Sequence, residues 1–574
     1  MNAATAELRD RVVTAMQGQD AEHAHALATE LVNAAPDSYD HRQMAGVTAL
    51  STNRAGEALQ HFQAAVRHAP QPPFAAAAWT GIGRTQLLAE DARQAERAFR
   101  RALSLVNEFP PALAGLAEAL SREGRHEEAE QAARRALELG IDEARLRVAL
   151  GHALLGMEKL EEAEAEFRRA QSMEPGAAEP RFGLGALAKF RGQFEEAERV
   201  YRQVLEEVPE FPGYSQLATL KTFDRDDPEI ETLERRLREL PPDAARSARS
   251  DLHFALAKAY DDAGLPEKAT GHLREGNALE RERLRHDPDE DEARMQRIAE
   301  LFTHEFIHRY EDAGVRELRP IFVVSLPRSG STLTEQMLAS HSQVRGGGEL
   351  GHFARVATAL SLRWGGRDDF PDIDPTAARN DLRDAGREYS RLTASLRLIH
   401  PHFTDKSLNN FLYVGLIRMM LPDARIVHVR RHPLATALGL YRQRFARGIG
   451  YSADLDHIVR HYRAYATLMD HWRQAAPEAF VEVHYEALVA EPERELRRIL
   501  DYIGLEFEPA CLEYYRLDRP VRTASVAQVR QPLDRKGLAR HERYGDLLAP
   551  VAEALKEEIA AYEAELADAT GGAA

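Results

Sequence analysis

Cysteine and long apolar runs are what this 574-residue chain has least of. The single cysteine, Cys511, excludes an internal disulfide and a cysteine-rich metal site, and it is typical of a reducing cytoplasm. No apolar run reaches the roughly 18 residues that a membrane span needs, and the N-terminus lacks the apolar core of a signal peptide. The net charge of −17 argues against general nucleic-acid binding. A cytoplasmic protein without membrane or nucleic-acid partners is therefore expected.

The first half of the chain contains a sequence repeat. Small residues recur at a spacing of 34 residues after one step of 37, and they are Gly46, Gly83, Ala117, Gly151 and Gly185. Twelve residues after each stands an alanine, in the series Ala58, Ala95, Ala129, Ala163 and Ala197. This period with small residues at these offsets is the tetratricopeptide pattern, in which two helices of a hairpin approach closely. Aromatic residues beside them should fill the gap to the next hairpin; these are Phe62, Phe99, Phe167 and Tyr201.

The end of the repeat region is less regular. Residues 251–278 indicate one more hairpin, and the highly charged residues 279–300 indicate a connecting helix. We place the domain boundary near residue 290, giving a repeat domain over 1–290 of six to seven hairpins and a second domain over 291–574. Such arrays build a concave surface that binds peptides or protein segments, while a purely structural array that packs on its neighbour or self-associates is the alternative.

The second half begins with the most informative stretch of the chain. Residues 321–324 are apolar and predict a buried parallel strand, and residues 333–339 predict a helix. Between them lie Arg328, Ser329, Gly330, Ser331 and Thr332. A strand, a tight turn and a helix N-terminus make an anion site, because free backbone N–H groups and the helix dipole attract negative charge.

Further strands and helices alternate after this loop. Residues 425–430 and 479–485 read as strands, and residues 410–421 and 454–474 as helices. This alternation predicts a parallel sheet covered on both faces, with ligands at the carboxyl ends of the strands. A basic cluster in this acidic chain lies in the same region and comprises Arg425, Arg430, Arg431, Arg442, Arg444 and Arg447.

The loop after the first strand lacks the lysine of a Walker A motif and the glycines of a dinucleotide fingerprint. Residues 327–333 instead resemble the 5′-phosphosulfate loop of the sulfotransferase family. The similarity is greatest to the branch of tyrosylprotein sulfotransferases and of bacterial sulfotransferases fused to tetratricopeptide repeats. The resemblance implies a multidomain chain: an all-α tetratricopeptide solenoid followed by an α/β, P-loop-like sulfotransferase domain with a parallel sheet.

Residues 431–439 resemble the family's 3′-phosphate motif. The resemblance implies that Arg431 pairs with the 3′-phosphate of the donor, a charge-assisted contact. The family has serine where this chain has Gly439. A missing hydroxyl weakens such a site by roughly 1 kcal/mol, the usual net contribution of a hydrogen bond. Thr436 is one candidate substitute.

Other family motifs imply the reacting groups. Residues 404–411 resemble a segment whose lysine, here Lys406, lies near the bridging oxygen of the leaving phosphate. In residues 344–350, Glu349 stands at the place of the catalytic base, with His341 and His352 as nearby alternatives. Tyr485, in a Tyr-Glu-x-Leu segment, is implied to contact the adenine.

Near the C-terminus, residues 522–532 and 535–540 resemble the end of the repeat-fused branch. The resemblance implies that Ser525, together with Lys536 or Arg540, closes over the phosphates of the donor. No metal is implied, and no dense set of His and Cys ligands occurs in the sequence.

The implied activity is transfer of a sulfuryl group from 3′-phosphoadenosine 5′-phosphosulfate to a hydroxyl or phenol, with a peptide tyrosine, a saccharide and a small molecule as candidate acceptors. Two alternatives stay open. One is a tetratricopeptide scaffold with an inactive transferase domain, which Gly439 keeps in play. The other is a P-loop kinase, against which the absent lysine counts.

Overall fold

The chain divides into two compact units, which are described separately. The computed structural model describes residues 3–242, 244–364, 370–371, 379–445, 449–517, 519, 528–535 and 537–571. The first unit consists mainly of Met1–Lys189 and Glu195–Val208, and the second of Phe190–Phe194, Pro209–Phe445 and Ile449–Ala574. The boundary that the repeat spacing indicates near residue 290 stays a prediction, because this division follows compactness rather than repeat sequence.

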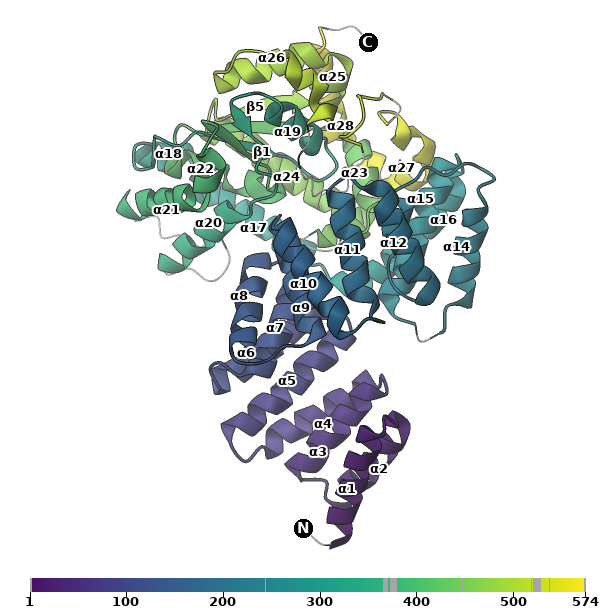
Figure 1. Cartoon of the computed structure of the whole chain (residues 1–574). Coiled ribbons are helices and arrows are strands. Elements are labelled where there is room, and N and C mark those ends of the chain that lie inside the picture. Colours follow the sequence, from purple (N-terminus) through teal and green to yellow (C-terminus); the bar gives the residue numbers. More distant parts are fainter. Residues whose placement is uncertain are drawn as a thin grey trace. The chain divides into compact units, whose positions relative to one another are not determined.

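The first unit is an array of helices drawn in purple to blue in Figure 1. In chain order they are α1 (Ala3–Gln17), α2 (Ala21–Ala34), α3 (Tyr39–Ser51), α4 (Ala55–His68), α5 (Pro72–Leu88), α6 (Ala92–Leu105), α7 (Pro110–Arg122), α8 (His126–Glu138), α9 (Ala144–Gly156), α10 (Leu160–Met173), α11 (Ala178–Phe190) and α12 (Phe194–Glu207). Consecutive helices pack as hairpins, for example α3 on α4 and α9 on α10. The predicted solenoid is confirmed.

The repeating glycines have the packing role that their spacing predicts. A Cβ atom on Gly46 would lie 2.7 Å from the ring of Phe62, and one on Gly151 would lie 2.7 Å from the ring of Phe167. Both rings are fully buried. Each aromatic side chain therefore fills the space that the missing side chain leaves, and a larger residue at either glycine would push the helices of a hairpin apart.

The second unit opens with helices α13 (Tyr214–Ala218), α14 (Pro228–Glu239), α15 (Arg246–Asp262), α16 (Pro266–Leu284), α17 (Pro288–Leu301) and α18 (His304–Tyr310). The hairpin predicted over 251–278 is α15 and α16. The prediction of a single connecting helix over 279–300 is wrong, because the helix is interrupted between Leu284 and Pro288. Arg285 ends α16 in the left-handed conformation, and α17 begins at Pro288 with the side chain of Asp287 as its N-cap.

The described residues of the second unit contain a parallel sheet with the strand order β2-β3-β1-β4-β5. The strands are β1 (Pro320–Val324), β2 (Val344–Arg345), β3 (His402–Asp405), β4 (Arg425–Arg430) and β5 (Phe480–His484). In the registers of β1, Phe322 lies opposite Asp405 on one side and Ile426 on the other. The chain leaves β1 toward β2 and β3 and later continues on the other side with β4, so the topological switch lies at β1.

Alternating residues of the central strands face two separate helical layers. Ile321 and Val323 share a buried cluster with Leu496 of α26 (Pro492–Ile503). Phe322 instead packs edge-on against Phe353 of α20 (His352–Arg363), with ring centroids 5.4 Å apart. The predicted two-sided cover of the sheet is thus confirmed, and it explains why the strands read as continuous apolar runs.

The remaining elements of the second unit surround this sheet (Figure 1). They are α19 (Ser331–Ala339), α21 (Arg379–Leu392), η1 (Ala394–Arg397), η2 (Leu408–Tyr413), α22 (Val414–Met420), α23 (Pro433–Tyr441), η3 (Gly450–Ala453), α24 (Leu455–Ala475), α25 (Tyr485–Ala490), η4 (Pro509–Arg516), η5 (Arg540–Tyr544), α27 (Gly545–Ala554) and α28 (Lys556–Ala569). Among the described residues, none of the helices combines the length and apolar character needed to cross a bilayer.

Candidate functional site

The carboxyl ends of the strands bring the predicted site residues to one edge of the sheet. Arg328 follows β1, Glu349 follows β2, Lys406 follows β3, Arg431 follows β4 and Tyr485 follows β5. Because all the strand pairs are parallel, these ends meet at the same edge. This edge beside a topological switch is where open α/β sheets bind ligands.

The loop after β1 has the geometry of an anion site. Gly330, the N-cap of α19, has φ +98°, a conformation that suits glycine, and the ring of Tyr485 occupies the space where a side chain would be. Ser331 and Thr332 then form the first turn of α19, where backbone N–H groups have no acceptor within the helix. Ser329 and both of these residues are buried.

Arg328 and Arg431 join the ends of β1 and β4. The Nη1 atom of Arg431 donates to the carbonyl oxygen of Arg328 at 3.1 Å, and its guanidinium lies 4.8 Å from the centre of the Tyr485 ring. Arg328 has φ +68°, which is uncommon for a residue with a side chain. Burial, followed by the positive charges of Arg431 and Arg442, lowers the pKa of Arg328 to about 10. Positive charge is thus concentrated at this edge.

Two buried polar atoms support an anionic ligand here. The Nε atom of Arg431 and the Oγ atom of Ser325, at the end of β1, have no hydrogen-bond partner among the described residues. A buried donor without an acceptor is costly, so such atoms usually mark a place that a ligand or water completes. The loop therefore fits a phosphate-bearing ligand.

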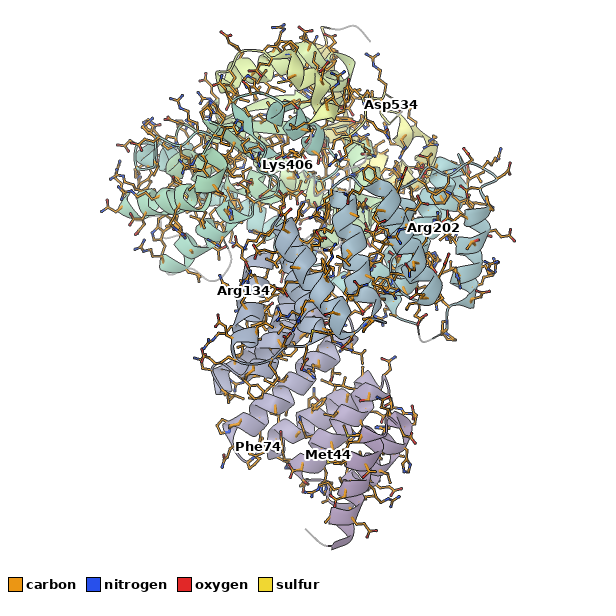
Figure 2. All side chains as sticks on the ribbon, viewed as in Figure 1. Met44, Phe74, Arg134, Arg202, Lys406 and Asp534 are labelled. Carbon is orange, nitrogen blue, oxygen red and sulfur yellow. The ribbon has the colours of Figure 1, made fainter. Side chains whose placement is uncertain are left out.

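Glu349 and Lys406 form a pair at the ends of β2 and β3. Lys406 Nζ donates to Glu349 Oε1 at 2.5 Å. Lys406 is 1% exposed, and it is labelled over the second unit in Figure 2. The side chain of Glu349 is 31% exposed, so it can meet a substrate from solvent. A carboxylate and an ammonium group this close provide a proton acceptor and a positive charge at one point.

Sequence reasoning did not single out the groups that hold Lys406 in place. Asp405 is buried and accepts hydrogen bonds from Tyr389 at 2.8 Å and from the side chains of Ser407 and Asn410. Burial raises the pKa of Asp405 above its ordinary value. Asp405, directly before Lys406, thus holds the end of β3 in place through these bonds and is not assigned to ligand binding.

The alternative histidine bases occupy different places. His341 precedes β2, at the opposite edge of the sheet, and its ring contacts the backbone of Glu506 and Gln343 at 2.9 and 3.1 Å. Both of its nitrogens are therefore engaged. His352 begins α20 three residues after Glu349, so it lies on the same side of the sheet as the Glu349–Lys406 pair.

Part of the basic cluster is neutralised inside the second unit. The buried carboxylate of Asp261, on α15, pairs with Arg442 and accepts from Arg543 at 3.0 Å and from Tyr544 at 2.7 Å. Arg540 lies 3.4 Å from the same carboxylate. Arg444 pairs with Glu280 of α16 at 3.0 Å, and Arg430 pairs with Glu565 of α28. Arg328 lies within the loop after β1, and Arg431 contacts the backbone of that loop.

Ser525, Lys536 and Arg447 lie outside the described residues. Next to Lys536, the carbonyl oxygen of Gly537 accepts from Arg431 Nη2 at 3.0 Å, so this part of the C-terminal segment reaches the end of β4. Thr436 donates to the carbonyl of Arg431 at 3.4 Å and is buried in α23.

Gly439 gives the first testable prediction. A Cβ atom at this position would lie 2.8 Å from Cβ of Arg328, so the glycine makes room for the side chain that the anion loop presents. Overpacking of this kind typically costs about 1–3 kcal/mol. If the donor is the one that the sequence resemblance implies, its product nucleotide is 3′,5′-bisphosphoadenosine. We expect Gly439→Ser and Gly439→Ala alike to weaken binding of this nucleotide by about 5- to 100-fold in calorimetry. Tighter binding by the serine variant alone would mean that the site has lost a hydroxyl it needs.

Glu335 of α19 is a second group that sequence reasoning missed. It is buried, although the neighbouring residues of α19 read as an ordinary helix start. Burial by itself raises the pKa of Glu335, but the positive charges of Arg519 and Lys406, together with hydrogen bonds, bring it down to about 2. The signal in the sequence is a charged residue within a helix that is buried all round, because such a charge needs a partner.

This low pKa predicts a pH-dependent contribution to stability. Glu335 has an ordinary pKa of 4.5 and a folded-state pKa of about 2, so its ionised form stabilises the fold above about pH 4.5 and this stabilisation is lost as the pH falls toward 2. We expect Glu335→Gln to lower the free energy of unfolding by about 3 kcal/mol at neutral pH. In urea titrations the difference in free energy of unfolding between this variant and wild type should shrink below about pH 4.5. A difference independent of pH would contradict the assigned pKa.

Among the described residues, no group of three or more His, Cys, Asp or Glu side chains could hold a metal ion. The described part of the site offers instead a loop of backbone N–H groups, guanidinium groups and a carboxylate–ammonium pair. This arrangement can bind a phosphate-bearing ligand and accept a proton from a nucleophile beside it.

Comparison with known proteins gives a family for each part of the chain. Residues 320–509 match the model of the sulfotransferase family, and tetratricopeptide models match residues 9–73, 44–105, 80–144 and 154–222. The chain thus carries a sulfotransferase-family domain and tetratricopeptide repeats, as its sequence predicts.

Relatives cover only parts of the chain. An uncharacterized protein of Aquifex aeolicus is 34% identical in an alignment that covers 60% of this chain and 46% of that protein. Protein-tyrosine sulfotransferase 1 of Danio rerio is 25% identical over 38% of this chain and 62% of its own length. The sulfotransferase domain from the Synechococcus PCC 7002 olefin synthase, a solved structure, is 23% identical over 40% of this chain and 89% of its own, with a TM-score of 0.30.

Proposed function

We propose that this chain, with its sulfotransferase-family domain and tetratricopeptide repeats, transfers a sulfuryl group from 3′-phosphoadenosine 5′-phosphosulfate to a hydroxyl or phenol acceptor. The observation that carries the proposal is that two arginines and a carboxylate–ammonium pair lie at the same edge of the sheet. Arg328 and Arg431 concentrate positive charge there, and the Glu349–Lys406 pair lies at the adjoining strand ends.

In this proposal each group acts on one part of the donor. The N–H groups of Ser331 and Thr332, with Arg328 and the Ser329–Gly330 turn, hold the 5′-phosphosulfate. Arg431 holds the 3′-phosphate, and Tyr485, already packed on Gly330 and Arg431, borders the nucleoside. Ser525 and Lys536 are proposed to complete the contacts with the donor, and this assignment rests on the sequence resemblance alone.

The transfer step needs a base and a cation. The acceptor oxygen attacks sulfur and forms the new S–O bond, while the bond from sulfur to the bridging phosphate oxygen breaks. Glu349 takes the acceptor proton through its carboxylate, and Lys406 stabilises the negative charge that grows on the bridging oxygen. The products are the sulfate ester and 3′,5′-bisphosphoadenosine. A metal has no role in this scheme.

The repeats and the location are part of the proposal. We propose that the repeat array binds a peptide or protein segment, which favours a peptide tyrosine among the acceptors. A reducing cytoplasmic location is supported by the single cysteine, since Cys511 is buried and burial raises the pKa of its thiol to about 11.

Calorimetry with 3′,5′-bisphosphoadenosine and with ATP tests the donor. We expect binding of the bisphosphate and at least tenfold weaker binding of ATP, because Arg431 is assigned to the 3′-phosphate. A preference for ATP would indicate a kinase, and failure to bind either nucleotide would indicate a scaffold with an inactive domain. Transfer of labelled sulfate to a panel of tyrosine peptides and saccharides would then identify the acceptor.

A further inference from the structure

Glu335 contacts every segment that carries the Glu349–Lys406 pair. Its Oε1 atom accepts from the backbone N–H of Gly348 at 2.8 Å and from the hydroxyl of Thr404 at 2.7 Å. Gly348 directly precedes Glu349, and Thr404 lies two residues before Lys406. The carboxylate on α19 thus links the end of β2 to the end of β3.

The turn that carries Glu349 depends on this link. Gly348 has φ +70°, its N–H is bonded to Glu335, and its carbonyl accepts from the backbone N–H of Lys406 at 2.8 Å. The hydroxyl of Thr404 also accepts from the N–H of Gly347 at 3.0 Å. With both polar groups of Gly348 held, the backbone leading into Glu349 has one position relative to Lys406.

Charge holds Glu335 itself in place. Arg519 Nη2 donates to Glu335 Oε2 at 2.9 Å, and the Nε atom of the same arginine donates to Gln336 at 2.7 Å. Among the described residues, the charged groups that face Glu335 are Arg519, from the C-terminal segment, and Lys406, after β3. A buried carboxylate between these two cations is held rigidly, as a positioning group must be.

We infer that Glu335 is a positioning residue, which fixes the Gly348 turn so that Glu349 and Lys406 face the same reacting bond. It touches neither donor nor acceptor. This inference rests on the proposed transfer reaction for its kinetic part, while its structural part concerns the turn alone.

Three variants separate this role from general stability. Glu335→Gln removes the charge but keeps one acceptor oxygen, and Thr404→Val removes the hydroxyl at nearly the same volume. Gln336→Leu is the matched control, because Gln336 lies on the same helix and contacts the same arginine, yet has no bond to the Gly348 turn.

Two measurements on the 574-residue chain test the inference. In hydrogen exchange, amides of residues 346–350 should exchange at least tenfold faster in Glu335→Gln and Thr404→Val, and remain as in wild type in Gln336→Leu. In turnover assays, kcat should fall by roughly 10- to 100-fold in the first two variants with an unchanged Kd for bisphosphoadenosine, since small misplacements of reacting groups cost about this much. The double variant should lose less than the product of the two single losses.

The split between a lowered kcat and an unchanged Kd is a readout that a general loss of stability would not produce. Unchanged exchange in residues 346–350 would overturn the inference even if wild type shows no transfer. Absence of transfer by wild type, with faster exchange in both variants, would overturn only the proposed reaction.

Discussion

Glu349→Gln is expected to lower turnover by about 10²- to 10⁴-fold while leaving the Kd for 3′,5′-bisphosphoadenosine unchanged. The carboxamide oxygen of glutamine can still accept the hydrogen bond from Lys406 Nζ, so the geometry of the pair is kept. It cannot take a proton near neutral pH, and the loss therefore falls on the chemical step. Single-turnover assays with labelled donor, together with calorimetry, separate these two quantities.

The control for this variant is Glu388→Gln. Glu388 lies on α21, where it pairs with Arg391 at 2.6 Å on an exposed surface. Its substitution should leave both turnover and donor binding at the wild-type values. Turnover of Glu349→Gln within about threefold of wild type would remove Glu349 from the role of base. His352, at the start of α20, would then be the next residue to replace.

The fold was predictable because its signals are local. Each repeat glycine and its aromatic partner, such as Gly46 and Phe62, are 16 residues apart, so one period contains the whole contact. The apolar runs of β1 and β4 are equally plain. The strands β2 and β3 escaped notice, because β2 has two residues and β3 contains His402, Thr404 and Asp405. These strands are defined by pairing with parallel neighbours that are distant in the sequence, so their own residues do not reveal them.

The residues that gather at the carboxyl edge of the sheet were predictable from the sequence, and the groups that hold them in place were not. Motifs that follow strand ends identified Arg328, Glu349, Lys406 and Arg431, because a parallel sheet brings such ends together. The partner of Arg442, the carboxylate of Asp261, is 181 residues away in the sequence. Arg519 and Glu335 are 184 residues apart. Pairings of this separation depend on the packing of α15 and of the C-terminal segment, which no local pattern contains.

The carboxylate partners of the arginines also change how the basic cluster is interpreted. Six arginines between residues 425 and 447 read as one positive patch in the sequence. In the structure Arg430, Arg442 and Arg444 have buried or partly buried carboxylates as partners. The arginines of the cluster thus have separate roles, and Arg431 is the one that contacts the loop after β1. Such a divided set of charges suits a ligand of defined shape better than a general polyanion.

Arg328→Met is expected to weaken binding of 3′,5′-bisphosphoadenosine by at least about 100-fold, and to leave the ligand-free chain as stable as wild type or more stable. Arg328 is a partly buried cation beside Arg431 and Arg442, and burial together with these positive charges lowers its pKa. Methionine keeps much of the side-chain volume without that charge. Sites that hold repelling charges for a ligand commonly gain stability when the charge is removed.

The opposite signs of these two effects make the experiment decisive. A variant that merely misfolds would lose binding and stability together, whereas Arg328→Met should lose binding with an equal or higher Tm. Arg425→Met is the matched control, because Arg425 begins β4 at the other edge of the sheet, with its guanidinium 5.5 Å from the centre of the Tyr502 ring. It should bind the bisphosphate as wild type does. Undiminished binding by Arg328→Met would show that the loop after β1 is not the phosphate site, because no other cation follows that strand before α19 begins.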